Sequence, residues 1–312
     1  MRQCAKAPTR IDLAGGTLDI WPLWNIIRHS VTVNVAIERF TTVTVENRGV
    51  SDEGLPAFIA KSVAEDCNLD DVPAVKIQTD YPSRMGLGGS SSLLLASLWC
   101  FEYFRTLPVE ELIRYCANLE SQFLKNLTGV QDFYPPLLGG VSAIHFDYQG
   151  PQHEQLVPGV NVVEILKHGM ILIHGSGQHV SGNINWQVVK NAIDGCKKTL
   201  SLLHRYAEAG NKARKSVLED DVKGLFSAIN EDMSARMELG DLVVPGNLRH
   251  LYEKIDKIGA LAGKICGAGG DSCLALFCYP RNVEHLSSYL QSEGWEVFPT
   301  SMSNSGVMLC NS

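Results

Sequence analysis

The alternation of apolar and polar positions makes the first half of the chain strand-rich and the second half helix-rich. Residues 30–45, SVTVNVAIERFTTVTV, alternate and are rich in Val and Thr, which predicts two strands with a bend near Glu38. Residues from about Ser90 to Phe104 are apolar on nearly every helical face, which predicts a central, buried helix. The other elements predicted before residue 147 are helices over 57–67 and 108–125 and strands over 72–80 and 141–146.

A mostly polar stretch, residues 147–159, separates the two halves and holds two Pro and two Gly, which predicts a crossover between domains. Beyond it the pattern predicts strands over 169–175, 272–279 and 295–300, and helices over 184–210, 217–236, 246–262 and 281–293. This organisation predicts two α+β layered domains, residues 1–158 and 159–312.

Composition narrows the class of protein. The chain has 312 residues, of which 45% are hydrophobic and 20% charged, as in ordinary soluble globular proteins. Its net charge of −7 disfavours nucleic acid and anionic membranes as main partners. The N-terminus lacks the apolar run of a signal peptide, and no stretch approaches the roughly 18 consecutive apolar residues of a membrane span.

Nine cysteines give a further indication about the compartment. Their number is odd, no two form a Cys-x-x-Cys pair, and several lie in apolar runs. This pattern indicates reduced, mostly buried thiols in a cytoplasmic protein. Cys266, Cys273 and Cys278 cluster, but their spacing matches no common zinc site, so we predict no metal there.

A loop of small residues precedes the central helix. The stretch SRMGLGGSSSLLLASLWCF begins at Ser83 and holds three glycines and four serines in its first ten residues. Glycine allows close backbone approach to a ligand, and a helix N-terminus attracts anions such as phosphate. Alternatively, Ser90 or Ser91 simply caps the helix. The stretch lacks the glycine pattern of a Rossmann fingerprint and the Gly-Lys-Ser/Thr of a Walker A loop, so it alone leaves both interpretations open.

Two further stretches, in order with this one, identify a family. KAPTRIDLAGGTLDI (6–20), SRMGLGGSSSL (83–93) and GKICGAGGDSCLALF (263–277) resemble the three motifs of the GHMP kinases, named for galactokinase, homoserine kinase, mevalonate kinase and phosphomevalonate kinase. The resemblance implies an N-terminal domain of the ribosomal-protein-S5-domain-2 type and a ferredoxin-like C-terminal domain. It also implies ATP as a cofactor. The residues implied to hold the ATP phosphates are Gly86, Leu87, Gly88, Gly89, Ser90, Ser91, Gly267 and Gly269.

The resemblance also implies roles for individual side chains. Ser90 and Glu120 correspond to the Mg²⁺ ligands, and Asp132, in the pattern Gly-Val-Gln-Asp-x-Tyr, corresponds to the catalytic aspartate of the sugar kinases. Arg10 matches a first-motif cation that would favour ionised Asp132 and stabilise phosphoryl charge. Asp19 matches the aspartate that binds sugar hydroxyls. The alternatives are a helix cap for Ser90, solvated acids for Glu120 and Asp19, a turn-forming Asp132 and a surface Arg10.

The substrate is indicated by finer details of the motifs. Gly15 and Gly16 replace the Glu-His pair of galactokinases and, with Gln131 and Tyr134, most resemble bacterial D-glycero-D-manno-heptose 7-phosphate kinases. We therefore predict that these four residues bind the substrate, and that Asp12 is structural. The heptose kinases have an Arg near the position of His179, so this departure puts a phosphorylated sugar in doubt.

Other features qualify this assignment without changing it. Asp271 follows the third motif's GAGG where more glycine is expected, and a carboxylate there would repel phosphate. Three tryptophans could stack on a sugar or pack in the core: Trp21, Trp24 and Trp186.

The sequence thus predicts a cytoplasmic kinase that uses ATP and Mg²⁺ to phosphorylate a small-molecule sugar or sugar phosphate, similar to heptose 7-phosphate. A mevalonate-type isoprenoid kinase and a non-catalytic nucleotide- and sugar-binding sensor of the same fold are the alternatives.

Overall fold

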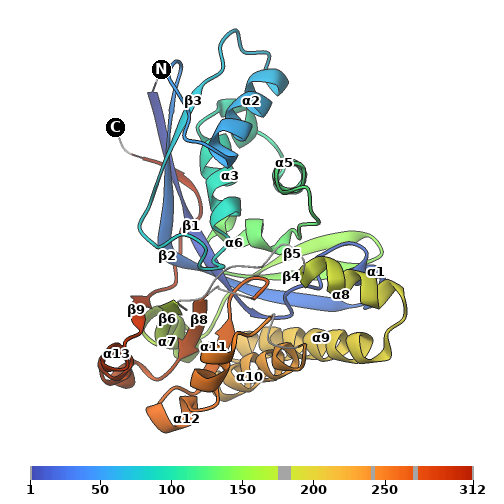
Figure 1. Ribbon diagram of the computed structural model, residues 1–312, viewed down its shortest axis with the longest axis vertical. Helices are drawn as coiled ribbons and strands as arrows, with labels where there is room; N and C mark the ends of the chain where they lie inside the picture. Colours follow the sequence, from blue (N-terminus) through green and yellow to red (C-terminus); the bar gives the residue numbers. More distant parts are fainter. Residues whose placement is uncertain (1, 175–183, 240–242, 270–272, 311–312) are drawn as a thin grey trace.

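The computed structural model describes residues 2–174, 184–239, 243–269 and 273–310, which fold around two β-sheets (Figure 1). The larger sheet has six strands in the order β10-β1-β2-β4-β5, with β3 also pairing with β2, and every pair is antiparallel. Its strands are β1 (Arg2–Ala14), β2 (Ser30–Glu46), β3 (Ala74–Thr79), β4 (Val141–Asp147), β5 (Gly150–Leu156) and β10 (Met308–Leu309).

Helices of the first half pack against this sheet around α3, which is buried along its length. Every residue from Ser91 to Leu98 is buried, as the apolar pattern predicts, because α3 lies between the sheet and α2 and α5. The elements of this half are α1 (Leu23–Ile26), α2 (Leu55–Asp66), α3 (Gly89–Trp99), α4 (Glu102–Arg105), α5 (Val109–Leu124), the 3₁₀ helix η1 (Gln131–Phe133) and α6 (Tyr134–Leu138).

The smaller sheet has four antiparallel strands in the order β7-β8-β6-β9. In chain order its elements follow a β-α-β-β-α-β pattern, which is the ferredoxin-like arrangement that the family resemblance implies. Its strands are β6 (Met170–His174), β7 (Ala262–Ile265), β8 (Cys273–Phe277) and β9 (Glu296–Thr300). The helices are α7 (Val160–His168), α8 (Ile184–Ile193), α9 (Lys197–Leu218), α10 (Val222–Glu238), α11 (Gly246–Tyr252), α12 (Ile255–Ile258), η2 (Pro280–Asn282) and α13 (Val283–Ser292).

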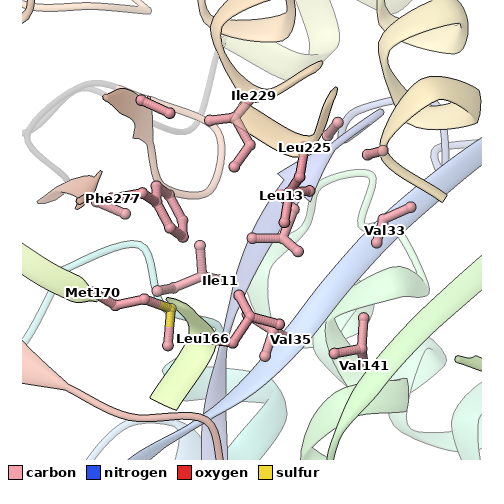
Figure 2. Packing of buried hydrophobic residues seen from close by; sticks show 14 of the residues in the cluster. Ile11, Leu13, Val33, Val35, Val141, Leu166, Met170, Leu225, Ile229 and Phe277 are labelled. Atoms are coloured by element: carbon pink, nitrogen blue, oxygen red, sulfur yellow. The ribbon is translucent and has the colours of Figure 1, made fainter. Parts of the chain in front are cut away.

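One hydrophobic cluster joins the two halves (Figure 2). In it Ile11 and Val35 of the larger sheet pack with Leu225 and Ile229 of α10 and with Phe277 of β8. The predicted boundary at residue 158 falls between β5 and α7 and stays a prediction. The α+β class is confirmed, and no described helix is both long and apolar enough to cross a membrane.

The predicted pair of strands over 30–45 is a single strand in the structure. Opposite Pro8 and Thr9 of β1, strand β2 carries Glu38 and Arg39 as two extra residues, which form a bulge. Pro8 has no N–H with which to pair, so the ladder is interrupted there. The sequence located the irregularity correctly, but β2 continues through it.

The predicted crossover over 147–159 is wrong in its first part. Residues Gly150–Leu156 form β5, which pairs with β4 through a tight turn where Gly150 has φ +100°. Strand β5 lies at the edge of the sheet, and an edge strand keeps polar side chains in contact with water. The composition of β5 therefore resembles that of a loop, which is why the sequence did not indicate a strand there.

Two predicted helices are interrupted in the structure. The helix expected over 184–210 breaks at Gly195, whose φ is +75°. The helix expected over 246–262 divides into α11 and α12 and ends at Gly259, with φ +91°, after which β7 begins. The short strands β7 and β10 and the long strand β1 were not predicted from the alternation of the sequence.

The burial of α3 leads to a stability prediction. Leu94 is 0% exposed at the middle of this helix, so Leu94→Ala removes packed methyl groups and leaves a cavity. We expect its free energy of unfolding to fall by about 2–5 kcal/mol in urea denaturation. Leu124→Ala, on a leucine of α5 that is 50% exposed, is the control. Equal losses in the two variants would contradict the central position of α3.

Candidate active site

The loop before α3 leaves the N-terminus of this helix open. Gly88, with φ +71° in the left-handed region, is the N-cap residue, and no side chain caps the helix by a hydrogen bond. Ser90 and Ser91 lie inside the helix, so the interpretation of either serine as a simple cap is wrong. The helix has 11 residues, and its free N–H groups and dipole favour an anion at this end.

A cavity of about 510 Å³ lies against this loop. Side chains fit closely around the glycines: a Cβ on Gly89 would lie 2.9 Å from the Tyr81 hydroxyl, and one on Gly88 would lie 3.3 Å from the Arg10 side chain. The cavity is lined by Arg10, Thr41, Leu55, Ile77, Thr79, Tyr81, Ser83, Arg84, Met85, Gly86, Leu87, Gly88, Gly89, Ser90, Leu93, Asp132, Gly267, Ala268 and Gly269. The dimensions and the open helix end suit a nucleotide with its phosphates at α3.

The third glycine-rich stretch docks the second half of the chain on this loop. A Cβ on Gly267, whose φ is +63°, would lie 3.0 Å from the Gly86 carbonyl oxygen. The Cys273 N–H donates to the Met85 carbonyl at 3.0 Å. The two glycine loops are therefore in direct contact. The predicted effect of Asp271 falls outside the described residues.

Arg10 and Asp132 form a two-pronged ion pair on one wall of the cavity. Arg10 donates from Nε to Asp132 Oδ1 at 2.8 Å and from Nη2 to Oδ2 at 2.6 Å, and its Nη1 donates to the Gly86 carbonyl at 2.7 Å. Arg10 is 2% exposed, so the interpretation as a surface arginine is wrong. Burial alone would lower the Arg10 pKa, but the charge and hydrogen bonds of Asp132 together with the Asp12 charge outweigh it and raise the pKa above its usual range.

A second, smaller cavity of about 60 Å³ shares this wall. Arg10, Asp132, Gly267 and Ala268 line both cavities. The second cavity is also lined by Thr17, Asp19, Ile20, Gly129, Gln131 and Asn185. A group bound in one cavity therefore meets a group bound in the other at the Arg10–Asp132 pair.

Asp19 is the buried acid of the smaller cavity. It is 3% exposed, so a solvated turn acid is excluded, and it accepts the Gln131 N–H at 3.1 Å. A Cβ on Gly129 would overlap the Asp19 carboxyl group, which makes glycine necessary there. Burial, and next the Asp132 charge, raise the Asp19 pKa to about 7.

Ser90 and Glu120 meet beside the loop over residues 83–88, which we call the phosphate loop after its predicted role. The Ser90 hydroxyl donates to Glu120 Oε1, although α5 carries the glutamate and α3 the serine. Glu120 is 6% exposed, so it is not a solvated helix acid. Burial raises its pKa to about 7 against the lowering effect of the Ser90 bond, and the Asp132 charge adds to the increase. A buried carboxyl group beside a hydroxyl is suited to binding a cation.

These two raised pKa values predict how stability depends on pH. With Asp19 and Glu120 at about 7, the folded protein binds more protons than the unfolded chain between about pH 4 and 7. The free energy of unfolding should therefore fall as pH rises through this window, by up to about 1.4 kcal/mol per pH unit for each group. Asp19→Asn and Glu120→Gln should each flatten this slope in urea denaturation. Asp194→Asn, at an exposed acid, is the control, and an unchanged slope in both site variants would contradict the prediction.

Three predicted substrate residues lie outside both cavities. Gly15 and Gly16 are buried, and the Gly15 N–H donates to Asp232 at 2.8 Å. Tyr134 is 1% exposed and stacks on His153 with ring centroids 5.2 Å apart. The fourth predicted residue, Gln131, does line the smaller cavity.

The structure adds residues to the two cavities that were not predicted from the sequence. Asn185 of α8 and Thr17 line the smaller cavity, and Tyr81 lines the larger one. Thr17 lies within the first motif, but the sequence analysis predicted no role for any of these three residues. Trp24 stacks on Phe146 in the core, with centroids 5.6 Å apart, whereas Trp21 and Trp186 are exposed. His179 lies outside the described residues.

Comparison with known protein families gives two matches along the chain. The family model described as "GHMP kinases N terminal domain" matches residues 55–140, and that described as "GHMP kinases C terminal" matches residues 213–296. The first range contains the phosphate loop, Glu120 and Asp132, and the second contains α10 and the third glycine-rich stretch.

Curated proteins and solved structures show similar chains. A probable glucuronokinase 2 of Arabidopsis thaliana is 26% identical over 243 residues, covering 73% of this chain and 65% of the relative. A D-glycero-alpha-D-manno-heptose 7-phosphate kinase of Campylobacter jejuni is 24% identical, covering 73% and 68%. The chain thus spans about two thirds of the length of each of these relatives.

Among solved structures, a D-glycero-D-manno-heptose 1-phosphate kinase from Bacteroides thetaiotaomicron has a TM-score of 0.75 at 19% identity, covering 100% of this chain and 99% of its own. A Lactococcus lactis galactokinase complexed with galactose has a TM-score of 0.75 at 15% identity, covering 98% and 95%. At these identities the structures show a shared fold.

Proposed function

The chain belongs to the GHMP kinase family, and from this premise we propose that it transfers the γ-phosphoryl group of ATP to a hydroxyl of a sugar or sugar phosphate. The observation that carries the proposal is the wall shared by the two cavities, where Arg10 and Asp132 face both. A nucleotide in the larger cavity and an acceptor in the smaller one would meet at this pair.

The donor site is the larger cavity. Its open α3 N-terminus and the contacting glycine loops suit the ATP phosphates. Ser90 and Glu120 fit Mg²⁺, because this ion commonly takes one or two protein oxygens beside phosphate oxygens, and the buried Glu120 carboxylate gains a cation there. When bound, Mg²⁺ would neutralise phosphate charge during transfer.

Asp132 is the proposed proton acceptor. The acceptor hydroxyl oxygen forms a bond to the γ-phosphorus, the bond from this phosphorus to the β-γ bridging oxygen breaks, and ADP leaves. The hydroxyl proton passes to the Asp132 carboxylate, which Arg10 orients through two hydrogen bonds. The Arg10 guanidinium also lies where negative charge develops on the phosphoryl oxygens.

The smaller cavity supports a polyol as acceptor. Asp19 accepts hydroxyl hydrogen bonds, and the Gln131 and Asn185 amides can both donate and accept them. Similarity to the Campylobacter kinase supports a heptose 7-phosphate as the substrate to test first. The Arabidopsis relative adds glucuronate to the candidates.

A panel of acceptors tests the proposal. We expect ADP release from Mg-ATP with one of heptose 7-phosphate, glucuronate, galactose and other free sugars, at a rate well above the reaction without acceptor. Mevalonate is included in the same panel. If it is the sole acceptor that is phosphorylated, the protein is an isoprenoid kinase instead. ATP binding without turnover of any sugar in an extended panel would show a sensor, and absence of ATP binding would refute the whole assignment.

A further inference from the structure

Four charged side chains form a buried tetrad outside both cavities. Asp12 comes from β1, Asp232 and Arg236 from α10, and Lys264 from β7, and each is at most 2% exposed. Arg236 Nε donates to Asp232 Oδ1 at 2.7 Å and Nη2 to Asp12 Oδ2 at 3.2 Å. Lys264 Nζ donates to Asp232 and lies 3.3 Å from Asp12 Oδ2. The tetrad therefore links the larger sheet to the second half of the chain.

The formal charges of the tetrad cancel. A gain in folding stability nevertheless does not explain why these four charged side chains are buried. Buried ion pairs lose hydration and are often no more stabilising than apolar side chains of the same volume. In some proteins such pairs are retained because they fix one geometry rather than because they add stability. Burial alone would raise the Asp232 pKa. The charges and hydrogen bonds of Lys264 and Arg236 outweigh this effect, so the net pKa is lowered and the carboxylate is charged.

The glycine pair of the first motif makes room for the tetrad. The Gly15 N–H donates to Asp232 Oδ2 at 2.8 Å. A Cβ on Gly16 would lie 2.7 Å from Arg236 Nη2 and would overlap Asp12 Oδ2. These contacts give both glycines a function in the tetrad rather than in a cavity.

The guanidinium of Arg236 extends from the tetrad to the active site. Its third prong, Nη1, donates to the Gly267 carbonyl at 3.1 Å, and the Tyr206 ring packs on its face at 5.3 Å from the ring centroid. Gly267 in turn contacts Gly86 of the phosphate loop and lines both cavities. One planar group thus binds Asp232, Asp12 and Gly267 in three directions.

We propose that Arg236 is a positioning residue for nucleotide binding: held by the tetrad, it fixes the Gly267 loop against the phosphate loop. This inference rests on the proposed function of the larger cavity as the ATP site. Without the Nη1 contact, the Gly267 carbonyl loses its charged donor and the loop loses its fixed distance from Gly86.

Two variants at this position separate positioning from stability. Arg236→Lys keeps the positive charge beside Asp12 and Asp232, but an ammonium cannot reproduce the three-direction fork. Arg236→Gln removes the charge as well. We expect both variants to bind Mg-ATP about 10-fold or more weakly by calorimetry, with KM for ATP raised and kcat changed less, because a charged hydrogen bond to Gly267 is lost in each. The melting temperature should fall substantially only in Arg236→Gln.

The matched control is another arginine–carboxylate fork between the two halves. Arg214 of α9 donates to Glu154 of β5 at 2.5 and 2.8 Å, and neither residue lines either cavity. Arg214→Lys should leave Mg-ATP affinity unchanged. If Mg-ATP affinity in the Arg236 variants follows their melting temperatures, or stays within about twofold of wild type, the proposal is overturned. Failure of the unaltered protein to bind ATP would instead refute the proposed function.

Gly16→Ala provides an independent test should the Arg236 variants not fold. Its added methyl group displaces Asp12 and Arg236 without removing any charge. The tetrad role predicts weaker Mg-ATP binding with acceptor KM little changed. A role of Gly16 in substrate binding predicts the reverse, which would overturn the inference.

Discussion

Asp132→Asn is expected to lower kcat by about 10²–10⁴-fold, the usual contribution of a positioned general base. Asparagine has nearly the same shape, and its side-chain oxygen can still accept from Arg10, but the amide cannot take the proton of the acceptor hydroxyl. Mg-ATP affinity should change little, because the proposed function assigns the phosphates mainly to the glycine loops. Steady-state kinetics with the accepted sugar and calorimetry with Mg-ATP measure the two effects separately.

The control for this variant is Asp220→Asn. Asp220 accepts hydrogen bonds from the Asn161 and Val162 N–H groups on the surface and lies outside both cavities. The Asp220→Asn variant should keep the kcat of the unaltered protein. A kcat near that of the unaltered protein in Asp132→Asn would remove Asp132 as the base, whatever the acceptor.

Arg10→Met should have the second large effect, a loss of about 10³-fold or more in kcat, as for other arginines that stabilise phosphoryl transfer. Three hydrogen bonds disappear together, two to Asp132 and one to the Gly86 carbonyl. The base loses its orientation, and the phosphoryl oxygens lose the nearest guanidinium. The KM for ATP should also rise, because Gly86 belongs to the phosphate loop.

Arg10→Lys separates charge from geometry at the same position. A single ammonium restores positive charge but not the fork, so its kcat should fall between those of Arg10→Met and the unaltered protein. Melting curves establish that both variants are folded before their kinetics are compared. Equal, full activity in the two variants would show that Arg10 takes no part in the transfer.

Much of this site could be predicted because its residues belong to the three motifs or to the stretch over residues 119–140 that contains Glu120 and Asp132. The buried α3 follows from its apolar pattern, and the resemblance paired Arg10 with Asp132, although 122 residues separate them. Ser90 and Glu120 were paired on the same basis, and the structure places them in contact.

What the sequence could not provide depends on contacts between distant elements. A buried arginine such as Arg236 looks the same in sequence as a solvated arginine on the polar face of a helix. Gly15 and Gly16 stand inside a motif, so they were assigned to the substrate, whereas the space they leave is filled by the tetrad. Asn185 reaches the smaller cavity from α8, which packs against α9 and α1.

Strand β10 has a consequence for how the protein is made. Met308 and Leu309 pair with Lys6 and Ala5 of β1, so two ends of the sequence complete one sheet. A ribosome adds about 5–20 residues per second, and roughly 300 residues separate the partners, so β1 waits about 15–60 s for its outer neighbour. During that time its edge is open to pairing with other strands. The edge of β1 at Ala5 and Lys6 therefore stays without its partner strand in the nascent chain until Met308 and Leu309 have been synthesised.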